Sequence, residues 1–187
     1  MRSAAAVLFV AIPPHLKFSA QEKRELRSFA SLLAARVADR RGFTCAITSD
    51  SALQQLNQVF LGRDYPTDVL SFPAPPDRAH DLGDIAISAE RASEQAAQFG
   101  HSLLEEIRIL MLHGVLHLMG LDHERDQGEM ARAEARWRAE LGLPAGLIER
   151  SHDTPRESFP APGFDSASTN HKPGTEKSAG SASGPQN

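Results

Sequence analysis

Three histidines in one short run constrain the fold of this chain more than any other feature: His113, His117 and His123. Residues four apart on a helix share one face, with β-carbons about 5–6 Å apart, so His113 and His117 can both reach one metal ion. His123 cannot lie on that face. Gly120 is typical of a left-handed helix stop, after which the chain can bring His123 back as a third ligand. The run therefore predicts a helix with a metal site at its C-terminal end.

Three neutral imidazole nitrogens indicate a catalytic zinc site, because they leave one position of a tetrahedral ion open, whereas structural sites usually have four protein ligands. Single histidines on apolar faces are usually ordinary core or surface residues. Here a third histidine follows the glycine, and the helix around the first two is otherwise apolar. We therefore expect one Zn²⁺ per chain, held by His113, His117 and His123, although the same imidazoles also accept nickel, copper or cobalt.

Gly114, directly after the first histidine, limits the chemistry. The spacing resembles the zinc-peptidase signature H-E-x-x-H-x-x-G-x-x-H, but a glycine stands where that signature has its catalytic glutamate. Glu105, Glu106 and Glu124 lie nearby in sequence, and none occupies the required position. The sequence disfavours a peptidase and leaves open another zinc hydrolase with a different base.

The C-terminal residues 151–187 contain no Leu, Ile, Val, Met or Trp and are rich in Pro, Gly and Ser. Such a segment cannot bury enough apolar surface to offset its ordering entropy. We therefore expect one folded domain over residues 1–150 and a disordered tail over residues 151–187.

Two further features favour a cytoplasmic protein that does not enter a membrane. Cys45 is the only cysteine, so no intrachain disulfide can form, and we expect it inside a strand. No run approaches the roughly 18 apolar residues that a membrane span requires. The apolar segment 4–12 is not followed by the cleavage site of a signal peptide.

Periodicity and capping signals give the order of secondary structure. The expected strands are 7–12, 43–48, about 69–72 and about 85–88. Five helices are expected. The first runs from a capping box at Ser19 and Glu22 to Gly42, the second lies around 53–60, and the third ends at Gly100. The fourth begins at a capping box at Ser102 and Glu105 and contains His113 and His117, and the fifth covers about 126–141. Strands and helices are interspersed without strict alternation. The pattern predicts a single α+β domain with a mixed β-sheet of about four strands, packed with about five helices, and the metal site on a central helix.

The charge balance argues against nucleic-acid binding through bulk electrostatics, since Lys+Arg 20 against Asp+Glu 24 gives a net charge of −4. Local basic patches would have to do this work. The candidates are Arg36, Arg40 and Arg41, and Arg132, Arg136 and Arg138. Such charge runs are more often solvated helix faces.

Three separate motifs, in order, resemble one protein family. Residues 113–123 match H-G-x-L-H-L-x-G-[YF]-D-H, with Leu121 where an aromatic residue is usual. Leu56-Asn57, followed by residues 64–73, is close to D-x-P-T-[DN]-V-L-S-F-P, and the third motif is residues 82–88. Over roughly residues 56–124 the chain resembles the YbeY-type endoribonucleases, also called ribosomal RNA maturation factors.

The resemblance implies a zinc-dependent, single-strand-specific endoribonuclease that acts in rRNA processing, especially 3′-end maturation of 16S rRNA, and in ribosome quality control. Its partners would be single-stranded RNA such as the 16S rRNA precursor, and the small ribosomal subunit or its proteins. His113, His117 and His123 would be the metal ligands.

One position departs from the family pattern. Members usually carry a cleft-lining arginine after an aromatic residue and before Gly-Lys, whereas this chain has Phe60, Leu61, Gly62 and Arg63. Arg63, two positions later, could take over the role of neutralising charge on the phosphate. We therefore expect Arg63 and His113 to be the catalytic residues, with His113 acting as a metal ligand.

Several roles stay open at this point. Asp84 and Asp122 are candidates for a general base, Thr67 and Ser71 for phosphate contacts, and Tyr65 for base stacking. Because of Leu61, a non-catalytic ribosome assembly or RNA-binding factor with structural zinc is an alternative to the enzyme, as is another zinc hydrolase.

Overall fold

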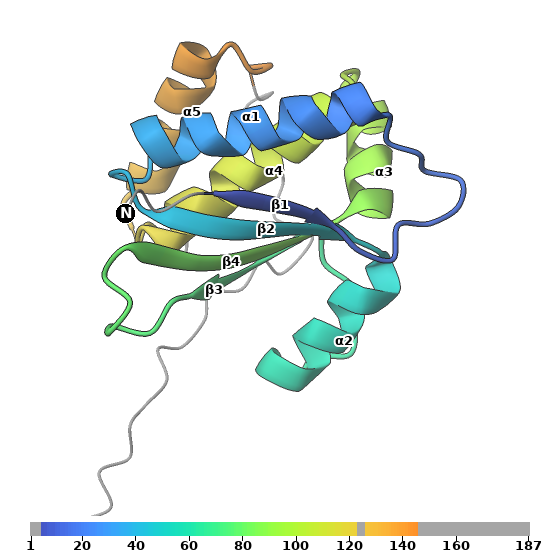
Figure 1. Cartoon of the computed structure of the whole chain (residues 1–187), viewed down its shortest axis with the longest axis horizontal. Coiled ribbons are helices and arrows are strands. Elements are labelled where there is room, and N and C mark those ends of the chain that lie inside the picture. Colours follow the sequence, from blue (N-terminus) through green and yellow to red (C-terminus); the bar gives the residue numbers. More distant parts are fainter. Residues whose placement is uncertain (1–4, 123–125, 146–187) are drawn as a thin grey trace, which may run out of the picture.

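The computed structural model describes residues 5–122 and 126–145 (Figure 1). Its elements are, in order, β1 (Ala6–Phe9), α1 (Ala20–Arg36), β2 (Gly42–Thr48), α2 (Asp50–Leu61), β3 (Val69–Pro73), β4 (Asp81–Ser88), α3 (Ala89–Phe99), α4 (Leu103–Leu118) and α5 (Glu129–Leu141). The predicted α+β domain with four strands and five helices is therefore confirmed.

The four strands form one mixed sheet in the order β1-β2-β4-β3. β1 pairs with β2 and β2 with β4 in parallel, whereas β3 runs antiparallel to β4 at the edge of the sheet. The antiparallel pair follows from the connection, because residues 74–80 join β3 directly to β4 as a hairpin.

The helices cover the two faces of the sheet unequally (Figure 1). α1 and α4 lie on one face, and α3 and α5 pack against α4. Of the described helices, only α2 lies on the other face, where Leu53 joins a small cluster with Leu70 and Ala86. α4 is buried along most of its length, so the predicted central helix is confirmed.

Both predicted capping boxes are present. The backbone N–H of Glu22 donates to the Ser19 hydroxyl (3.1 Å), and the backbone N–H of Glu105 donates to the Ser102 hydroxyl (3.3 Å). In each case the glutamate carboxylate accepts in return from the backbone N–H of the capping serine. Local side-chain chemistry thus decides where α1 and α4 begin.

Two helix boundaries differ from the prediction. α1 ends at Arg36 and does not reach Gly42, because Asp39 (φ 50°) and Arg40 (φ 62°) adopt left-handed backbone conformations that stop it, and Gly42 opens β2 instead. α5 begins at Glu129 and not near residue 126. The Asp126 carboxylate precedes it and accepts hydrogen bonds from the backbone N–H groups of Gly128 and Met130, both 2.7 Å.

Cys45 lies in β2, as predicted, and is fully buried. Burial raises the pKa of its thiol to about 12, so the thiol is protonated at neutral pH. None of the helices in the described part of the chain is long and apolar enough to cross a membrane. The predicted tail over residues 151–187 lies outside the described residues, so the division of the chain near residue 150 stays a prediction.

Candidate metal centre

The end of α4 is built by Gly120. Its φ of 91° is left-handed, which glycine adopts without steric cost. The N–H of Leu121 donates to the carbonyl oxygen of Leu116 (3.1 Å), and the N–H of Gly120 to that of His117 (2.9 Å). These two bonds form the Schellman pattern of a helix C-terminus, so the predicted helix stop at Gly120 is confirmed.

His113 and His117 converge on one point beside α4. Their Nε2 atoms lie 3.1 Å apart, and their ring planes are inclined by 73°. His113 is buried, with 5% of its surface exposed, whereas His117 is half-buried. The pair therefore presents two ring nitrogens to a small region at the boundary between the core and solvent.

Helix α5 contacts this pair on the Nδ1 side of His113. The Glu134 Oε2 atom lies 2.9 Å from His113 Nδ1, and the other carboxylate oxygen of Glu134 accepts a hydrogen bond from the Arg138 guanidinium. All three side chains are largely buried, with exposed fractions of 6% for His113, 16% for Glu134 and 8% for Arg138. The sequence places Arg138 only in a candidate basic patch and does not single out Glu134.

The geometry of the histidine pair fits a zinc ion. Two ligands of a tetrahedral zinc with Zn–N bonds of 2.0–2.1 Å lie roughly 3.3–3.4 Å apart, close to the 3.1 Å between the two Nε2 atoms. Among the described residues there is no cluster of three or more His, Cys, Asp or Glu side chains that could hold a metal. The expected third ligand, His123, lies outside the described residues, so the set of three ligands stays a prediction.

Gly114 has a packing role that excludes the peptidase signature at this position. A β-carbon placed there would lie 2.9–3.2 Å from three side-chain carbons of Ile85 in β4. A glutamate would thus be driven into the sheet. The carbonyl oxygen of Gly114 also accepts from the Ser71 hydroxyl of β3 (3.3 Å). The glycine therefore lets α4 approach the sheet closely.

The other nearby glutamates do not replace the missing one. Glu105 caps the N-terminus of α4, where hydrogen bonds from Ser102 lower the pKa of its carboxyl group. Glu106 is buried and pairs with His101 at the same end of the helix (2.5 Å). Both lie at the opposite end of α4 from His117. Glu124 is outside the described residues.

The second candidate region is the loop that follows α2. Leu61, at the position of the family's arginine, is partly buried against the small cluster of Leu53, Leu70 and Ala86. Gly62 ends the helix with a left-handed φ of 70°. Arg63 then points its Nη1 atom at the Tyr65 hydroxyl (3.4 Å). The loop belongs to the helix on the opposite face of the sheet from α4 (Figure 1).

Buried polar groups anchor this loop. The Asn57 Nδ2 atom donates to the Tyr65 carbonyl oxygen (2.7 Å), and Asn57 itself is buried. The Thr67 hydroxyl donates to the Asp68 carboxylate (3.3 Å), which also accepts from Gln95 (3.0 Å). The hydroxyls of Thr67 and Ser71 thus make hydrogen bonds inside the protein, which favours their roles as turn and strand residues over phosphate contacts.

The two aspartates considered as bases lie in different surroundings. Asp84 is exposed on the face of the sheet opposite α4, since its neighbour Ile85 points at Gly114 and successive side chains of a strand alternate. Asp122 follows Gly120 and is half-buried, and its carbonyl oxygen accepts from the N–H of Asp126 (2.9 Å). Of the two, only Asp122 adjoins the end of α4.

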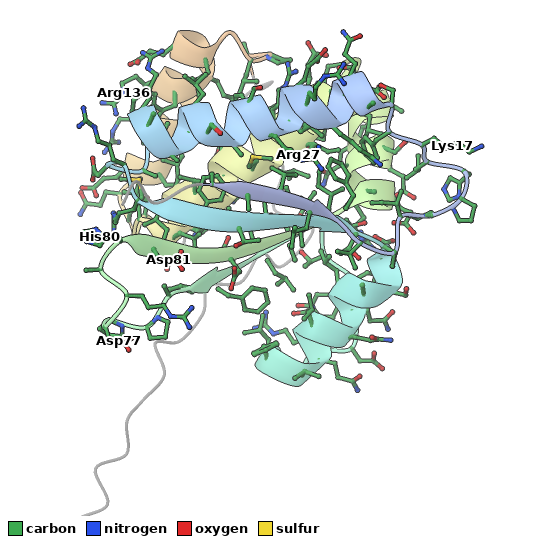
Figure 2. All side chains as sticks on the ribbon, in the orientation of Figure 1. Lys17, Arg27, Asp77, His80, Asp81 and Arg136 are labelled. Atoms are coloured by element: carbon green, nitrogen blue, oxygen red, sulfur yellow. The ribbon has the colours of Figure 1, made fainter. Side chains whose placement is uncertain are left out.

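The basic patches suggested by the sequence are largely neutralised. Arg138 is buried and paired with Glu134. Arg136 is exposed on α5 (Figure 2), where it lies 3.8 Å from Glu140 and stacks over the Trp137 ring. Arg36 pairs with the same Glu140 (3.4 Å). For Arg36 and Arg136 these contacts favour the interpretation of solvated helix faces, whereas Arg138 is buried and does not belong to such a face.

Comparisons with known proteins agree with the motifs. The sequence model of the family Endoribonuclease YbeY matches residues 16–142. The chain is 52% identical over 146 residues to Endoribonuclease YbeY of Solibacter usitatus, covering 78% of this chain and 94% of that protein. It is 57% identical over 105 residues to the Koribacter versatilis protein of that name, covering 56% of this chain and 68% of its relative. The corresponding Helicobacter pylori protein is 44% identical over 107 residues, covering 57% of this chain and 76% of its relative.

Proposed function

The chain belongs to the YbeY endoribonuclease family, and from this premise we propose that it is a zinc-dependent endoribonuclease that cleaves single-stranded RNA. It acts in the cytoplasm on the 16S rRNA precursor, especially in maturation of the 3′ end, and in ribosome quality control. The small ribosomal subunit or its proteins guide it to this substrate. One Zn²⁺ per chain is held by His113, His117 and His123.

The convergence of the two imidazoles carries this proposal. Two ring nitrogens 3.1 Å apart, one on a buried side chain, favour a shared metal ion over two unrelated core histidines. When bound, zinc supplies Lewis acidity toward a phosphoryl oxygen and lowers the pKa of water toward about 7. His113 and His117 present their Nε2 lone pairs to it, and α4 fixes their spacing.

In this proposal the RNA crosses the edge strand β3, on which both α2 and α4 pack, so that Arg63 supplies positive charge for the phosphate that reacts beside His113. Its guanidinium can form paired hydrogen bonds to phosphate oxygens, and it replaces the arginine that the family carries at the position of Leu61. The left-handed Gly62 and the bond from Asn57 to the Tyr65 carbonyl fix the path of the loop. Tyr65, which contacts Arg63, offers a ring on which an unpaired base can stack.

One observation favours a second candidate function. The family's cleft arginine is replaced by Leu61, whose side chain packs into the apolar cluster beneath α2. A protein that binds small-subunit precursors without cleaving them would not need that arginine. In this alternative the zinc ion is structural, and its removal lowers the stability of the fold and not only turnover.

The test is cleavage of end-labelled small-subunit precursor RNA by the purified protein, with the zinc content measured for each variant. We expect His117→Ala to lose zinc and at least about 100-fold in cleavage while its circular dichroism spectrum is retained. Arg63→Ala should keep zinc and lose at least about 10-fold. The exposed Arg24→Ala on α1 is the matched control and should cleave like the wild type.

Absence of cleavage by the zinc-loaded wild type, even with small ribosomal subunits added, would contradict the enzyme and favour the binding factor. Equal cleavage by Arg63→Ala and Arg24→Ala would remove Arg63 from the site and leave the metal centre unaffected.

A further inference from the structure

Glu134 and Arg138 on α5 form a buried polar chain that ends on His113. Glu134 Oε2 lies 2.9 Å from His113 Nδ1, and the other oxygen of the same carboxylate contacts Arg138. The three residues come from two helices that pack against each other, α4 and α5. This row of polar side chains therefore reaches the candidate metal centre on the Nδ1 side of His113, away from His117.

We propose that Glu134 is a positioning residue of the metal centre, which orients the His113 ring and fixes its tautomer, and that Arg138 holds Glu134 in place. The proposal rests on the proposed function in one respect, since it takes His113 as a metal ligand. It adds two residues outside the three-histidine motif, and it makes α5 a part of the site.

Hydrogen-bond chemistry carries the first step. A carboxylate can only accept hydrogen bonds, so the nitrogen that faces it must carry the proton, and here that nitrogen is Nδ1 of His113. A neutral imidazole has one N–H, so Nε2 is left with a lone pair. This Nε2 atom is the one that lies 3.1 Å from Nε2 of His117. The carboxylate thus selects the tautomer that can bind a metal at the point where the two rings meet.

Orientation is the second step. An imidazole ring can rotate about the Cβ–Cγ bond that joins it to the side chain. A hydrogen bond to the nitrogen that does not bind the metal removes that freedom. Glu134 can do this reliably because its second oxygen is fixed by Arg138, four residues later on the same helix. The exposed fractions of 6%, 16% and 8% leave little room for competing water. The ring of His113 is therefore held before metal binds.

A contribution to the stability of the fold is a poor explanation for the buried pair of Glu134 and Arg138. Burying an ion pair is often no more favourable than filling the same volume with apolar side chains. Arg138 is not fully satisfied either, because its Nε atom is buried and has no hydrogen-bond partner among the described residues. A buried, incompletely bonded arginine is easier to understand if the carboxylate that it holds has a task at His113.

The same helix provides a matched control. Arg136 and Glu140 form another ion pair four residues apart on α5, with Nε to Oε1 3.8 Å, but their side chains are 64% and 41% exposed. They have the same carboxylate and guanidinium groups as Glu134 and Arg138 without the link to a histidine, and Glu140 also pairs with the exposed Arg36 of α1 (3.4 Å). Glu134→Gln with Arg138→Met removes the buried pair without leaving an unpaired charge, and Glu140→Gln with Arg136→Met removes the exposed one.

The experiment measures the zinc dissociation constant by competition with a chelator, and the tautomer of His113 by ¹⁵N-edited NMR of the metal-free protein. Loss of an outer hydrogen bond to a ligand typically costs about 10–100-fold in metal affinity. We expect this loss for the buried double variant and a change of less than about twofold for the exposed one. His113 should be the Nδ1–H tautomer in the wild type and in the control, and should populate Nε2–H in the buried variant.

Three outcomes would overturn the proposal: an unchanged dissociation constant together with an unchanged tautomer in the buried variant, an Nε2–H tautomer in the metal-free wild type, or no zinc uptake by the wild type. If the buried double variant does not fold, the tautomer of His113 in the wild type still tests the proposal. Zinc uptake with the expected shift but without RNA cleavage would contradict the proposed function and leave the role of Glu134 intact.

Discussion

The C-terminal ends of α4 and α2 are built in opposite ways, although the family pattern assigns functional residues to both. Near the end of α4, His113 is buried and contacts Glu134 on α5, which in turn contacts Arg138. At the end of α2, Val59 and Phe60 are 76% and 60% exposed, and Leu61 stands where the resemblance to the family predicts an arginine. A substitution at the buried end disturbs the neighbours that pack on it, whereas the fold tolerates substitution at an exposed end at a smaller cost.

Gly114→Glu should produce the largest effect, because it places a charged side chain where a β-carbon already lies 2.9 Å from Ile85. Overpacking and burial of a charge together should cost at least about 3 kcal/mol of unfolding free energy. Denaturant unfolding of this variant and of Gly114→Ala measures the cost. A combination of Gly114→Ala with Ile85→Ala should cost less than the sum of the two single changes. Strict additivity would contradict the close packing of α4 on β4.

Leu61→Arg tests whether the end of α2 tolerates restoration of the family residue. The long arginine stem can lie along the cluster that Leu61 now contacts, so the unfolding free energy should fall by less than about 1.5 kcal/mol. Cleavage of single-stranded RNA should rise by about 10-fold, since a second cation near the phosphate stabilises its charge. If the variant cleaves no better than the wild type while Arg63→Ala remains impaired, Arg63 already fills the role completely.

Gly62→Ala separates backbone strain from packing at the same place. A β-carbon there meets no atom within 4 Å, but the φ of 70° disfavours any side chain. The expected loss of unfolding free energy is about 1–2 kcal/mol, well below that of Gly114→Glu. Gly62→Asn is the control, because asparagine adopts the left-handed region more readily. An alanine variant as stable as the wild type would show that the helix end relaxes freely.

Phe60→Ala should have the smallest effect. The ring is 60% exposed and makes an edge contact with Phe72 at 5.0 Å between centroids. Its removal should cost about 0.5–1 kcal/mol. The same truncation of the fully buried Leu112 in α4 should cost about 2–5 kcal/mol. Thermal unfolding of both variants measures the contrast, and similar losses would mean that α2 is as deeply packed as α4.

Local patterns predicted the helical framework of the candidate metal centre well. The spacing of His113 and His117, the left-handed stop at Gly120 and the capping box at Ser102 are decided within a few residues of chain, so the sequence alone indicates them. The absence of a glutamate after His113 was also visible. Its physical reason, the approach of Ile85, required the sheet to be placed against the helix.

The rest of the candidate metal centre depends on contacts between distant segments. Glu134 and Arg138 are spaced four apart and look like a solvated ion pair in the sequence, as Arg136 and Glu140 are in fact. Only the packing of α5 on α4 separates the two pairs. The early end of α1 depends in part on such a contact, since Gly42 pairs with Asp81 of β4 and its N–H donates to the carbonyl oxygen of His80 (2.9 Å), so that Gly42 begins β2.

Diffraction from zinc-loaded crystals on both sides of the zinc absorption edge shows whether His113 and His117 share one zinc ion. We expect a single anomalous peak per chain, within roughly 2.0–2.1 Å of Nε2 of both histidines, with His123 as the third protein ligand. A zinc peak elsewhere, or none beside the two histidines, would contradict this expectation.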